Sequence, residues 1–436
     1  MAGEEKLSRQ ITAWGIWLLA VNGMIGAGIF AVPAGAAALM GVWSPLVYVV
    51  CAALLGLIVA CFAELASRFK STGGPVLYVS SAFGRFAGFQ TGIAVYATRI
   101  TAFAANVNLM VASIAFFFPV LSDGPGRIAA LIAIIALLAG INIAGAKPAM
   151  RAMGLLTILK FLPLLAIALV GLFHIEPSLF PENSTGFPES AQWSAAVLLV
   201  IYAFVGWESA VIPAGETRNP ARSMPLGLFW ALGVVALLYV VIQIVSVAVV
   251  PDLANSERAL VDAGAILFGP AGALLLTIGV IVSIGGNATG TVVTAPRLTY
   301  AMAREKTLPG WFGKVSERTH VPVNSILFFA VIASVLAVFG DFFALAAMSA
   351  FVRVLIYVGC IATMPVIRKR EPESGHAMRL PLGWTIPVLA VLGSLVLLSQ
   401  VPLRSMAITA AFLMIAAVIY FAMQWISSRQ APEDAR

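Results

Sequence analysis

Apolar stretches of about 20 residues, the length that an α-helix needs to cross a lipid bilayer, recur along the whole sequence. Short segments rich in glycine, proline and charge separate them. Hydrophobic residues make up 61% of the chain and charged residues only 10%, whereas a soluble domain carries roughly 25% charged residues. The sequence therefore predicts one all-α integral membrane domain.

The apolar stretches predict about twelve transmembrane helices. They are expected at residues 11–38, 44–66, 86–118, 128–145, 152–173, 194–215, 227–250, 271–302, 322–340, 342–367, 382–402 and 406–426. An even number of spans puts both termini on the same side of the membrane.

The distribution of basic residues supports these spans, because lysine and arginine collect in cytoplasmic loops. With the N-terminus in the cytoplasm, only Arg127, Arg258 and Arg404 fall in outer loops. We therefore expect a multi-pass protein of the cell inner (plasma) membrane, with cytoplasmic tails at residues 1–10 and 427–436. The net charge of +7 is dispersed through short loops, which is not the pattern of a nucleic-acid-binding surface.

The sequence offers no constellation typical of an enzyme or a metal site. The cysteines, Cys51, Cys61 and Cys360, fall inside spans without the spacing of a disulfide framework or a set of metal ligands. All the histidines lie in loops, so no Ser/His/Asp or HExxH arrangement falls within the spans. We expect no enzymatic activity, no cofactor and no metal.

The first span contains Gly23, Gly26 and Gly28 within six residues, followed by Pro33. Each glycine costs a helix about 1 kcal/mol relative to alanine. Backbone that leaves helical geometry at membrane depth persists only where protein or a polar cavity satisfies its hydrogen bonds. The pattern therefore predicts an unwound segment that marks a site. Alternatively, the glycines form a small-residue face for helix packing.

The sixth span carries a second interruption, with Gly206 beside the carboxylate of Glu208 and with Pro213 just beyond. Spans one and six occupy corresponding positions if the first ten helices form two five-helix repeats of opposite orientation. A pair of interrupted segments in such positions is the best sequence indication of a secondary transporter's binding site.

Four segments share their motifs and their order with a known family. They are residues 26–30 (GAGIF); Glu64 with residues 73–78 (GGPVLY) and 83–84 (FG); residues 206–210 (GWESA) with 216–220 (ETRNP) and Pro225; and residues 297–304 (RLTYAMAR) with 308–309 (LP). Together they resemble the amino acid-polyamine-organocation (APC) permease family. Within that family, the sequence is similar to the arginine/agmatine-type exchangers and to the light-chain amino acid transporters.

The resemblance implies the LeuT-type fold. In that fold the transporter core, at residues 11–367, consists of two inverted repeats of five helices, at about residues 11–173 and 194–367. Helices 1 and 6 are unwound in it, and the two helices at residues 382–426 are additional. The resemblance also implies transport of an amino acid or a polyamine.

The two interrupted helices suggest how a substrate is held. Free N–H groups at residues 26–28 form a helix N-terminus that suits a carboxylate. Unpaired carbonyl groups at residues 204–206 suit an ammonium group, so the pair predicts an α-amino acid. The candidate substrate-binding residues are Asn22, Ile25, Gly26, Ala27, Gly28, Tyr202, Phe204, Val205, Gly206, Trp207, Asn287 and Thr291.

Two of these residues, Tyr202 and Trp207, are also candidates for an aromatic gate, with apolar packing as the alternative. Exchangers of basic substrates would be expected to carry a tryptophan at the position of Tyr202. The sequence therefore does not favour an arginine-specific site.

Two ionisable side chains within spans are candidates for ion coupling. A carboxylate within the membrane is rare and usually functional, so we expect Glu208 to bind and release a proton; alternatively, it is a buried acid bonded to unwound backbone. Lys160 lies in span five, where an ammonium costs about 2.5–3.5 kcal/mol. The resemblance implies that this ammonium takes the place of the sodium ion of sodium-coupled relatives, and the alternative is extension to the cytoplasmic surface.

Three further residues are expected to have structural or gating roles. Arg99 resembles an arginine of the light-chain transporters, and we expect it to brace the third helix against a carboxylate or a carbonyl group rather than to contact substrate. Arg353 and Tyr357, in span ten, are expected to line or gate the cavity.

The predicted function is secondary active transport of an α-amino acid by alternating access, as proton-coupled uptake or as exchange. A cationic amino acid or polyamine antiporter is the alternative within transport, and a channel or an amino acid-binding receptor is the alternative outside it. The expected partners are an amino acid, protons and the lipid bilayer. The sequence does not specify the oligomeric state, for which a homodimer is one option.

Overall fold

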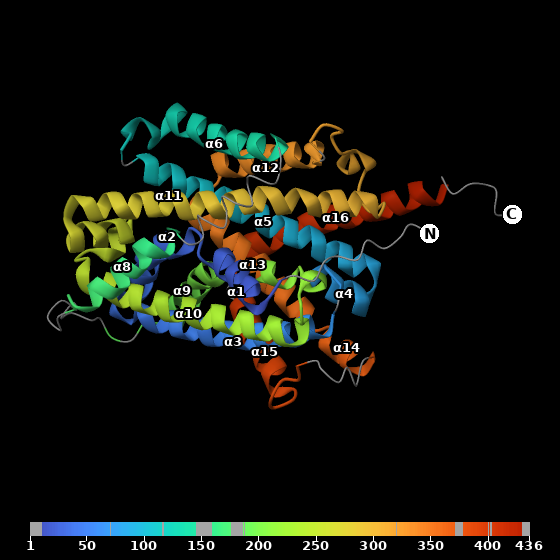
Figure 1. Cartoon of the computed structure of the whole chain (residues 1–436), viewed down its shortest axis with the longest axis horizontal. Coiled ribbons are helices and arrows are strands. Elements are labelled where there is room, and N and C mark those ends of the chain that lie inside the picture. Colours follow the sequence, from blue (N-terminus) through green and yellow to red (C-terminus); the bar gives the residue numbers. More distant parts are fainter. Residues whose placement is uncertain are drawn as a thin grey trace. The chain divides into compact units, whose positions relative to one another are not determined.

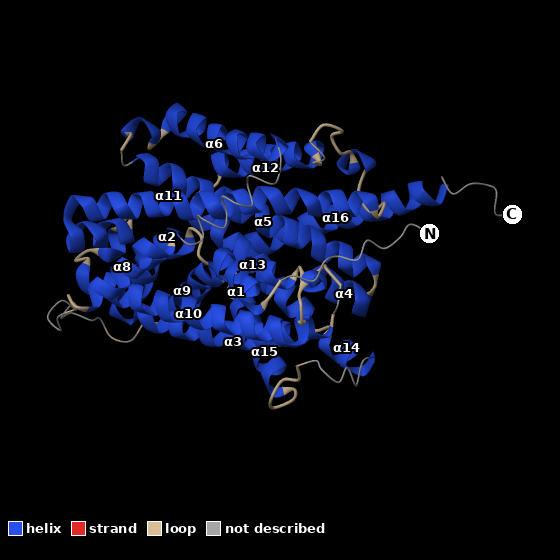
Figure 2. Ribbon diagram, viewed as in Figure 1, coloured by secondary structure: helices blue, strands red, loops and turns tan. Residues whose placement is uncertain are grey.

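The computed structural model describes residues 11–69, 71–115, 117–144, 159–175, 186, 188–319, 321–370, 378–399, 401 and 403–429. Over these residues the chain is helical apart from its connecting segments (Figure 1 and Figure 2). The connecting segments of this part include a single isolated bridge between Ile11 and Thr217. The all-α prediction is confirmed for this part of the chain. The predicted tail at residues 1–10, the predicted tail from residue 430 onward, and residues 152–158 of the fifth span lie outside the described residues.

Apolar helices that could cross a membrane occur along the described chain. Six segments are long and apolar enough: Gly28–Arg68, Gly124–Ala144, Pro220–Val249, Ala259–Arg304, Phe342–Arg370 and Ser405–Ile426. Shorter apolar helices are Ala13–Met24, Phe161–Leu172, Ser190–Phe204, Val323–Phe339 and Thr385–Ser399. The helix Arg85–Ala115 is long, but it carries polar side chains such as Arg99 and Asn106. Each predicted span therefore contains helix, although only six segments meet both criteria.

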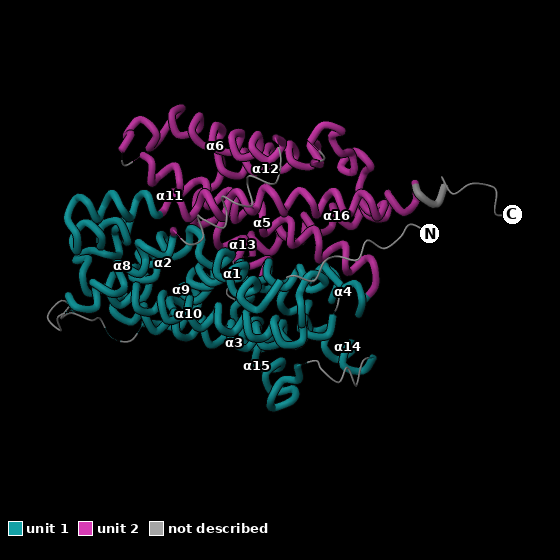
Figure 3. Tube along the Cα trace, in the orientation of Figure 1, with its two compact units in different colours: residues 1–83, 160–279, 354–400 teal, residues 84–159, 280–353, 401–436 magenta. Residues whose placement is uncertain are grey.

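The chain divides into two compact units, each assembled from three separated segments (Figure 3). The first unit comprises residues 1–83, 160–279 and 354–400, and the second comprises residues 84–159, 280–353 and 401–436. This division reflects which segments pack together and does not test whether the two predicted five-helix repeats are inverted copies of each other. The inverted repeats therefore stay a prediction.

The first unit contains the interrupted helices. Its elements are α1 (Ala13–Met24), α2 (Gly28–Met40), η1 (Gly41–Trp43), α3 (Ser44–Arg68), α4 (Pro75–Phe83), α8 (Phe161–Leu172), α9 (Ser190–Phe204), η4 (Trp207–Val211), η5 (Ala214–Glu216), α10 (Pro220–Val249), η6 (Leu253–Asn255), α14 (Met364–Arg370) and α15 (Thr385–Ser399). Helix α10 packs along α3, α1 and α8, while α2 packs against α9 and α1 against η4.

Helix α10 shows how the sequence produces this packing. Buried residues such as Leu228, Ala231 and Val235 recur at spacings of three and four, which places them on one face of the helix. On the opposite side, Trp230 and Leu237 are 63% and 69% exposed, yet they are equally apolar. A helix that is apolar all round suits a position between protein and lipid.

The second unit is built from longer helices. Its elements are α5 (Arg85–Ala115), η2 (Pro119–Leu121), α6 (Gly124–Ala144), η7 (Gly310–Gly313), α12 (Val323–Phe339) and α16 (Leu403–Arg429). Helix α12 packs against α5 and α6, and α16 packs against α5. Two helices, α11 (Ala259–Arg304) and α13 (Phe342–Ile361), each contribute residues to both units.

Candidate functional site

The first predicted interruption is present: α1 ends at Met24 and α2 begins at Gly28. The N–H group of Gly26 donates to the carbonyl oxygen of Met24 at 2.9 Å. Among the described residues, no acceptor is found for the N–H groups of Ala27, Gly28 and Ile29. The free donors at the start of α2 therefore begin at Ala27, one residue later than the sequence predicted, because Gly26 already has a backbone partner.

The second interruption lies where α9 ends at Phe204 and η4 begins at Trp207. Between them Gly206 has φ +113°, a conformation that favours glycine. The Gly206 carbonyl oxygen accepts from the N–H and hydroxyl groups of Ser209, at 3.2 and 2.7 Å. Within the described part of the chain, the carbonyl groups of Phe204 and Val205 receive no donor. Two of the three predicted acceptors are thus unpaired, while the third is used locally.

The two interruptions face each other through their glycines. A Cβ atom built on Gly23 would overlap the Gly206 carbonyl oxygen, and one built on Gly206 would overlap the Gly23 carbonyl oxygen. A Cβ atom on Gly28 would lie 2.6 Å from the Cα atom of Ala203. The glycines of the first span therefore serve both predicted purposes, because the segment is interrupted and also packs closely against a neighbouring helix.

Lys160 is 1% exposed and lies against the C-terminal end of α1. Its Nζ atom donates to the Asn22 side-chain oxygen and to the Ile25 carbonyl oxygen, both at 2.7 Å, and to the Asn22 carbonyl oxygen at 3.1 Å. A cation is stabilised at a helix C-terminus by the free carbonyl groups and the negative end of the dipole. The alternative that Lys160 extends to the cytoplasmic surface is excluded by this burial.

Tyr239, on α10, is a residue of this site that the sequence reasoning missed. Its hydroxyl donates to the Met24 carbonyl oxygen at 3.0 Å, and its ring contacts that of Phe204 with centroids 5.1 Å apart. It thereby touches the ends of both α1 and α9. The available signal was a hydroxyl group in the middle of an otherwise apolar stretch.

Glu208 is 8% exposed and is bonded to the unwound backbone, as one of the two sequence interpretations expected. Its Oε2 atom accepts from the Gly206 N–H group at 2.8 Å and from the Tyr357 hydroxyl of α13 at 3.2 Å. The carboxylate therefore holds the second interruption and joins it to α13. Its role as a proton site stays a prediction.

The aromatic candidates near Glu208 are buried in ring contacts. The Trp207 ring stacks on that of Tyr357, with centroids 5.4 Å apart, and meets the edge of Phe62 at 4.9 Å. Tyr202 is also buried, in the last turn of α9. Both side chains have the burial expected of packing residues, and a gating role stays a prediction.

The remaining candidates belong to the second unit. The Asn287 side-chain oxygen accepts from the Asn106 amide at 3.1 Å, and the Thr291 hydroxyl donates to the Asn287 carbonyl oxygen at 3.0 Å. Arg99 donates to the Thr294 hydroxyl at 3.3 Å, so it braces α5 against α11, and the predicted contact with a carboxylate or a carbonyl group stays a prediction. Arg353 is buried in α13.

No group of three or more His, Cys, Asp or Glu side chains within the described residues could hold a metal ion. What the first unit offers instead is a set of backbone donors, a set of backbone acceptors, one buried ammonium and one buried carboxylate, all at or beside the two interruptions. Such a set can bind a small molecule that carries both a carboxylate and an ammonium group.

Comparison with known proteins gives matches over most of the chain. A family model described as amino acid permease matches residues 11–424. The serine/threonine exchanger SteT of Bacillus subtilis is 28% identical over 397 residues, which is 88% of each chain. The branched-chain amino acid permease BcaP of Lactococcus lactis is 27% identical over 432 residues, 93% of this chain and 92% of that protein. The large neutral amino acids transporter small subunit 2 of Rattus norvegicus is 26% identical over 420 residues, 88% of this chain and 77% of its own.

Proposed function

Because the chain belongs to the amino acid permease family, we propose that it is a secondary amino acid transporter that holds its substrate at the two helix interruptions of the first unit. The observation that carries this proposal is that the start of α2 packs directly against the end of α9, and that among the described residues the N–H groups of the first and the carbonyl groups of the second find no partner. The N–H groups are complementary to the carboxylate, and the carbonyl groups to the ammonium group, that all α-amino acids share.

The substrate carboxylate binds the N–H groups of Ala27, Gly28 and Ile29, where the positive end of the α2 dipole adds to the hydrogen bonds. The substrate ammonium group binds the carbonyl groups of Phe204 and Val205 at the end of α9. A polyamine has no carboxylate and would leave the donors of α2 unpaired. This arrangement therefore supports an amino acid over a polyamine as the substrate.

Lys160 supplies the positive charge that the C-terminal end of α1 needs. Its three hydrogen bonds already occupy the side-chain and carbonyl oxygens of Asn22 and the carbonyl oxygen of Ile25, which are the kind of ligands a sodium ion would take. Transport accordingly proceeds without sodium.

The substrate side chain and the mode of coupling are proposed from the relatives and from Glu208. The three relatives described above are named for serine and threonine, for branched-chain amino acids and for large neutral amino acids. We accordingly propose a neutral amino acid, carried by exchange or with a proton. For the second mode, Glu208 is the proposed proton site, because protonation would weaken its bonds to Gly206 and Tyr357.

Alternating access through a LeuT-type pair of inverted repeats is part of the same proposal, as are the inner-membrane location and the cytoplasmic termini. A carrier of this kind needs parts that move as bodies. The division of the chain into two compact units, which share α11 and α13, supports such a mechanism.

Counterflow in proteoliposomes tests the proposed function. Labelled serine, threonine, leucine and isoleucine are offered to vesicles that contain either no amino acid or an excess of one unlabelled amino acid. We expect saturable uptake without sodium, accelerated by internal amino acid if the protein exchanges. Absence of saturable flux for every neutral amino acid would contradict the proposal.

Two variants locate the site within this assay. Gly28→Ala places a Cβ atom 2.6 Å from the Cα atom of Ala203 and should abolish uptake, because the start of α2 must move away from α9. Gly233→Ala, on α10, meets no atom within 4 Å and should transport as the wild type does.

A further inference from the structure

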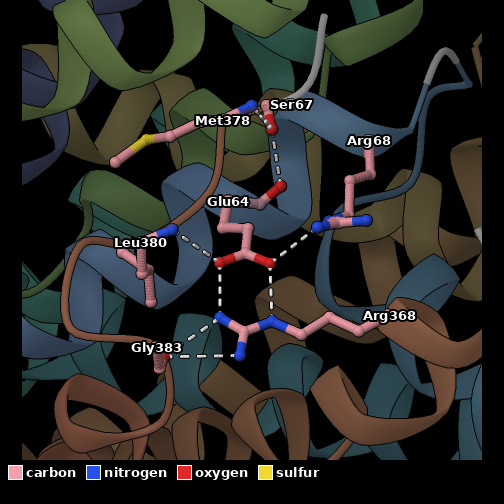
Figure 4. A network of polar contacts seen from close by, with 7 residues as sticks. All are labelled: Glu64, Ser67, Arg68, Arg368, Met378, Leu380 and Gly383. Atoms are coloured by element: carbon pink, nitrogen blue, oxygen red, sulfur yellow. Dashed lines mark hydrogen bonds and ion pairs between the residues drawn. The ribbon is translucent and has the colours of Figure 1, made fainter. Parts of the chain in front are cut away.

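Glu64, near the C-terminal end of α3, takes no part in the proposed substrate site although it belongs to one of the sequence motifs. Its side chain is 1% exposed. Arg368 of α14 donates to both carboxylate oxygens, from Nε to Oε1 at 2.8 Å and from Nη2 to Oε2 at 2.6 Å (Figure 4). Arg68 donates to Oε1 at 2.9 Å, and the N–H group of Leu380 donates to Oε2 at 3.1 Å.

The same network binds the segment that leads into α15. The N–H group of Met378 donates to the Ser67 hydroxyl at 3.0 Å, and Arg368 also donates to the Gly383 carbonyl oxygen at 3.4 Å (Figure 4). The Arg368 guanidinium lies 4.2 Å from the centroid of the Trp384 ring. The end of α3 is therefore joined to α14 and to residues 378–384 at several points.

Helix α14 is held by this network in addition to its packing against α4. Helix α13 ends at Ile361 and α14 begins at Met364, so α14 is not held by a continuous helix. A bidentate pair between arginine and carboxylate fixes both the distance and the orientation of the two side chains. The ion pair therefore fixes the cytoplasmic continuation of α13 to α3.

Helix α3 also contacts α13 itself, through Phe62, which lies two residues before Glu64. Its ring contacts the ring of Tyr357 with centroids 5.6 Å apart, and the Tyr357 hydroxyl donates to Glu208. Helix α3 thus holds the chain of α13 and α14 at two positions, by a ring contact at Tyr357 and by an ion pair at Arg368. Tyr357 lies between the ion pair and the site.

We propose that Glu64 and Arg368 are positioning residues, whose ion pair holds the Tyr357 hydroxyl against the Glu208 carboxylate. The proposal rests on the proposed function for the role of Glu208, whereas the fixing of α13 and α14 to α3 does not depend on it. Loss of the pair frees the end of α13, withdraws the Tyr357 hydroxyl and leaves Glu208 bonded to Gly206.

The reactivity of two native cysteines reports directly whether the end of α13 opens. Cys360, three residues after Tyr357, is buried with its thiol 4.0 Å from the Pro75 carbonyl oxygen. Cys51 is equally buried, but it lies about 20 Å along α3 from Glu64. Opening of the α13 end exposes Cys360 but not Cys51, whereas general unfolding exposes both.

The experiment measures N-ethylmaleimide labelling of each cysteine by peptide mass spectrometry in purified Glu64→Gln and Arg368→Gln protein. We expect the labelling rate of Cys360, relative to Cys51, to rise about tenfold or more in both variants, because each variant removes the bidentate pair that joins α14 to α3 and so favours local opening. Lys369→Gln removes a charge from an exposed neighbour on α14 and should leave the ratio unchanged. An unchanged ratio in both ion-pair variants would overturn the proposal.

Uptake kinetics test the link to Tyr357. Glu64→Gln and Tyr357→Phe should each raise the KM for substrate several-fold more than they lower the maximal rate, and the double variant should be no worse than the more affected single variant. Additive effects would show that the ion pair acts independently of Tyr357. If the wild type carries no amino acid, the proposed function fails, while the labelling ratio still decides whether the pair anchors α13.

Discussion

Replacing Gly206 with alanine tests how closely the two helix interruptions approach each other. Gly206 has φ +113°, and a residue with a side chain held in such a sparsely populated region costs about 1–3 kcal/mol. The new Cβ atom would also overlap the Gly23 carbonyl oxygen, and overpacking of this kind costs typically about 1–3 kcal/mol. We therefore expect Gly206→Ala to lose about 2–6 kcal/mol of the free energy of unfolding.

Thermal unfolding of the purified protein in detergent measures this loss. A loss of about 1 kcal/mol shifts Tm by about 2–4 °C in a chain of 150–250 residues and by less in a longer one, so a fall of several degrees is expected. Gly233→Ala is the matched control, because its Cβ atom meets nothing within 4 Å and alanine favours helix. A Gly206→Ala protein as stable as the Gly233→Ala protein would refute the close approach.

Three other substitutions probe the groups around the interruptions. Lys160→Met removes three hydrogen bonds to the end of α1, each charge-assisted bond being typically worth about 1.5–3 kcal/mol, and should lower Tm and abolish uptake. Uptake at the wild-type rate would show that the ammonium group is dispensable. Tyr239→Phe removes one hydrogen bond and should cost about 1 kcal/mol in thermal unfolding, with the ring contact to Phe204 retained. Glu208→Gln can still accept from the Gly206 N–H group, so the protein should fold but lose the pH dependence of its uptake; an unchanged rate and pH profile in proteoliposomes would remove the proton role.

The sequence predicted the features that arise from local chemistry. Glycine at positions 23, 26 and 28 disfavours helix wherever it occurs, so the first interruption could be located without knowing what surrounds it. Likewise, a carboxylate in an apolar stretch must find partners, and a bond from Glu208 to the unwound backbone was one of the two interpretations that the sequence allowed.

The partners of these groups could not be predicted, because they come from distant parts of the chain. Nothing near Met24 in the sequence indicates that the hydroxyl of Tyr239 caps its carbonyl group. Similarly, the motif around Glu64 does not reveal that Arg368, far along the chain, holds its carboxylate. Residue spacing also could not predict that the Gly26 N–H group would donate to the nearby Met24 carbonyl oxygen. The donors left free at the start of α2, among the described residues, therefore begin at Ala27.

The central claim is that the two interruptions bind the carboxylate and the ammonium group of one amino acid. Ligand-induced change in Tm measures it most directly, because a ligand that binds only the native state raises stability. Neutral amino acids are compared with their methyl esters, which lack the carboxylate, and with their N-acetyl derivatives, which lack the ammonium group. We predict that at least one free amino acid raises Tm in a concentration-dependent way and that neither of its derivatives does. An equal rise with the ester or the N-acetyl form would contradict the claim.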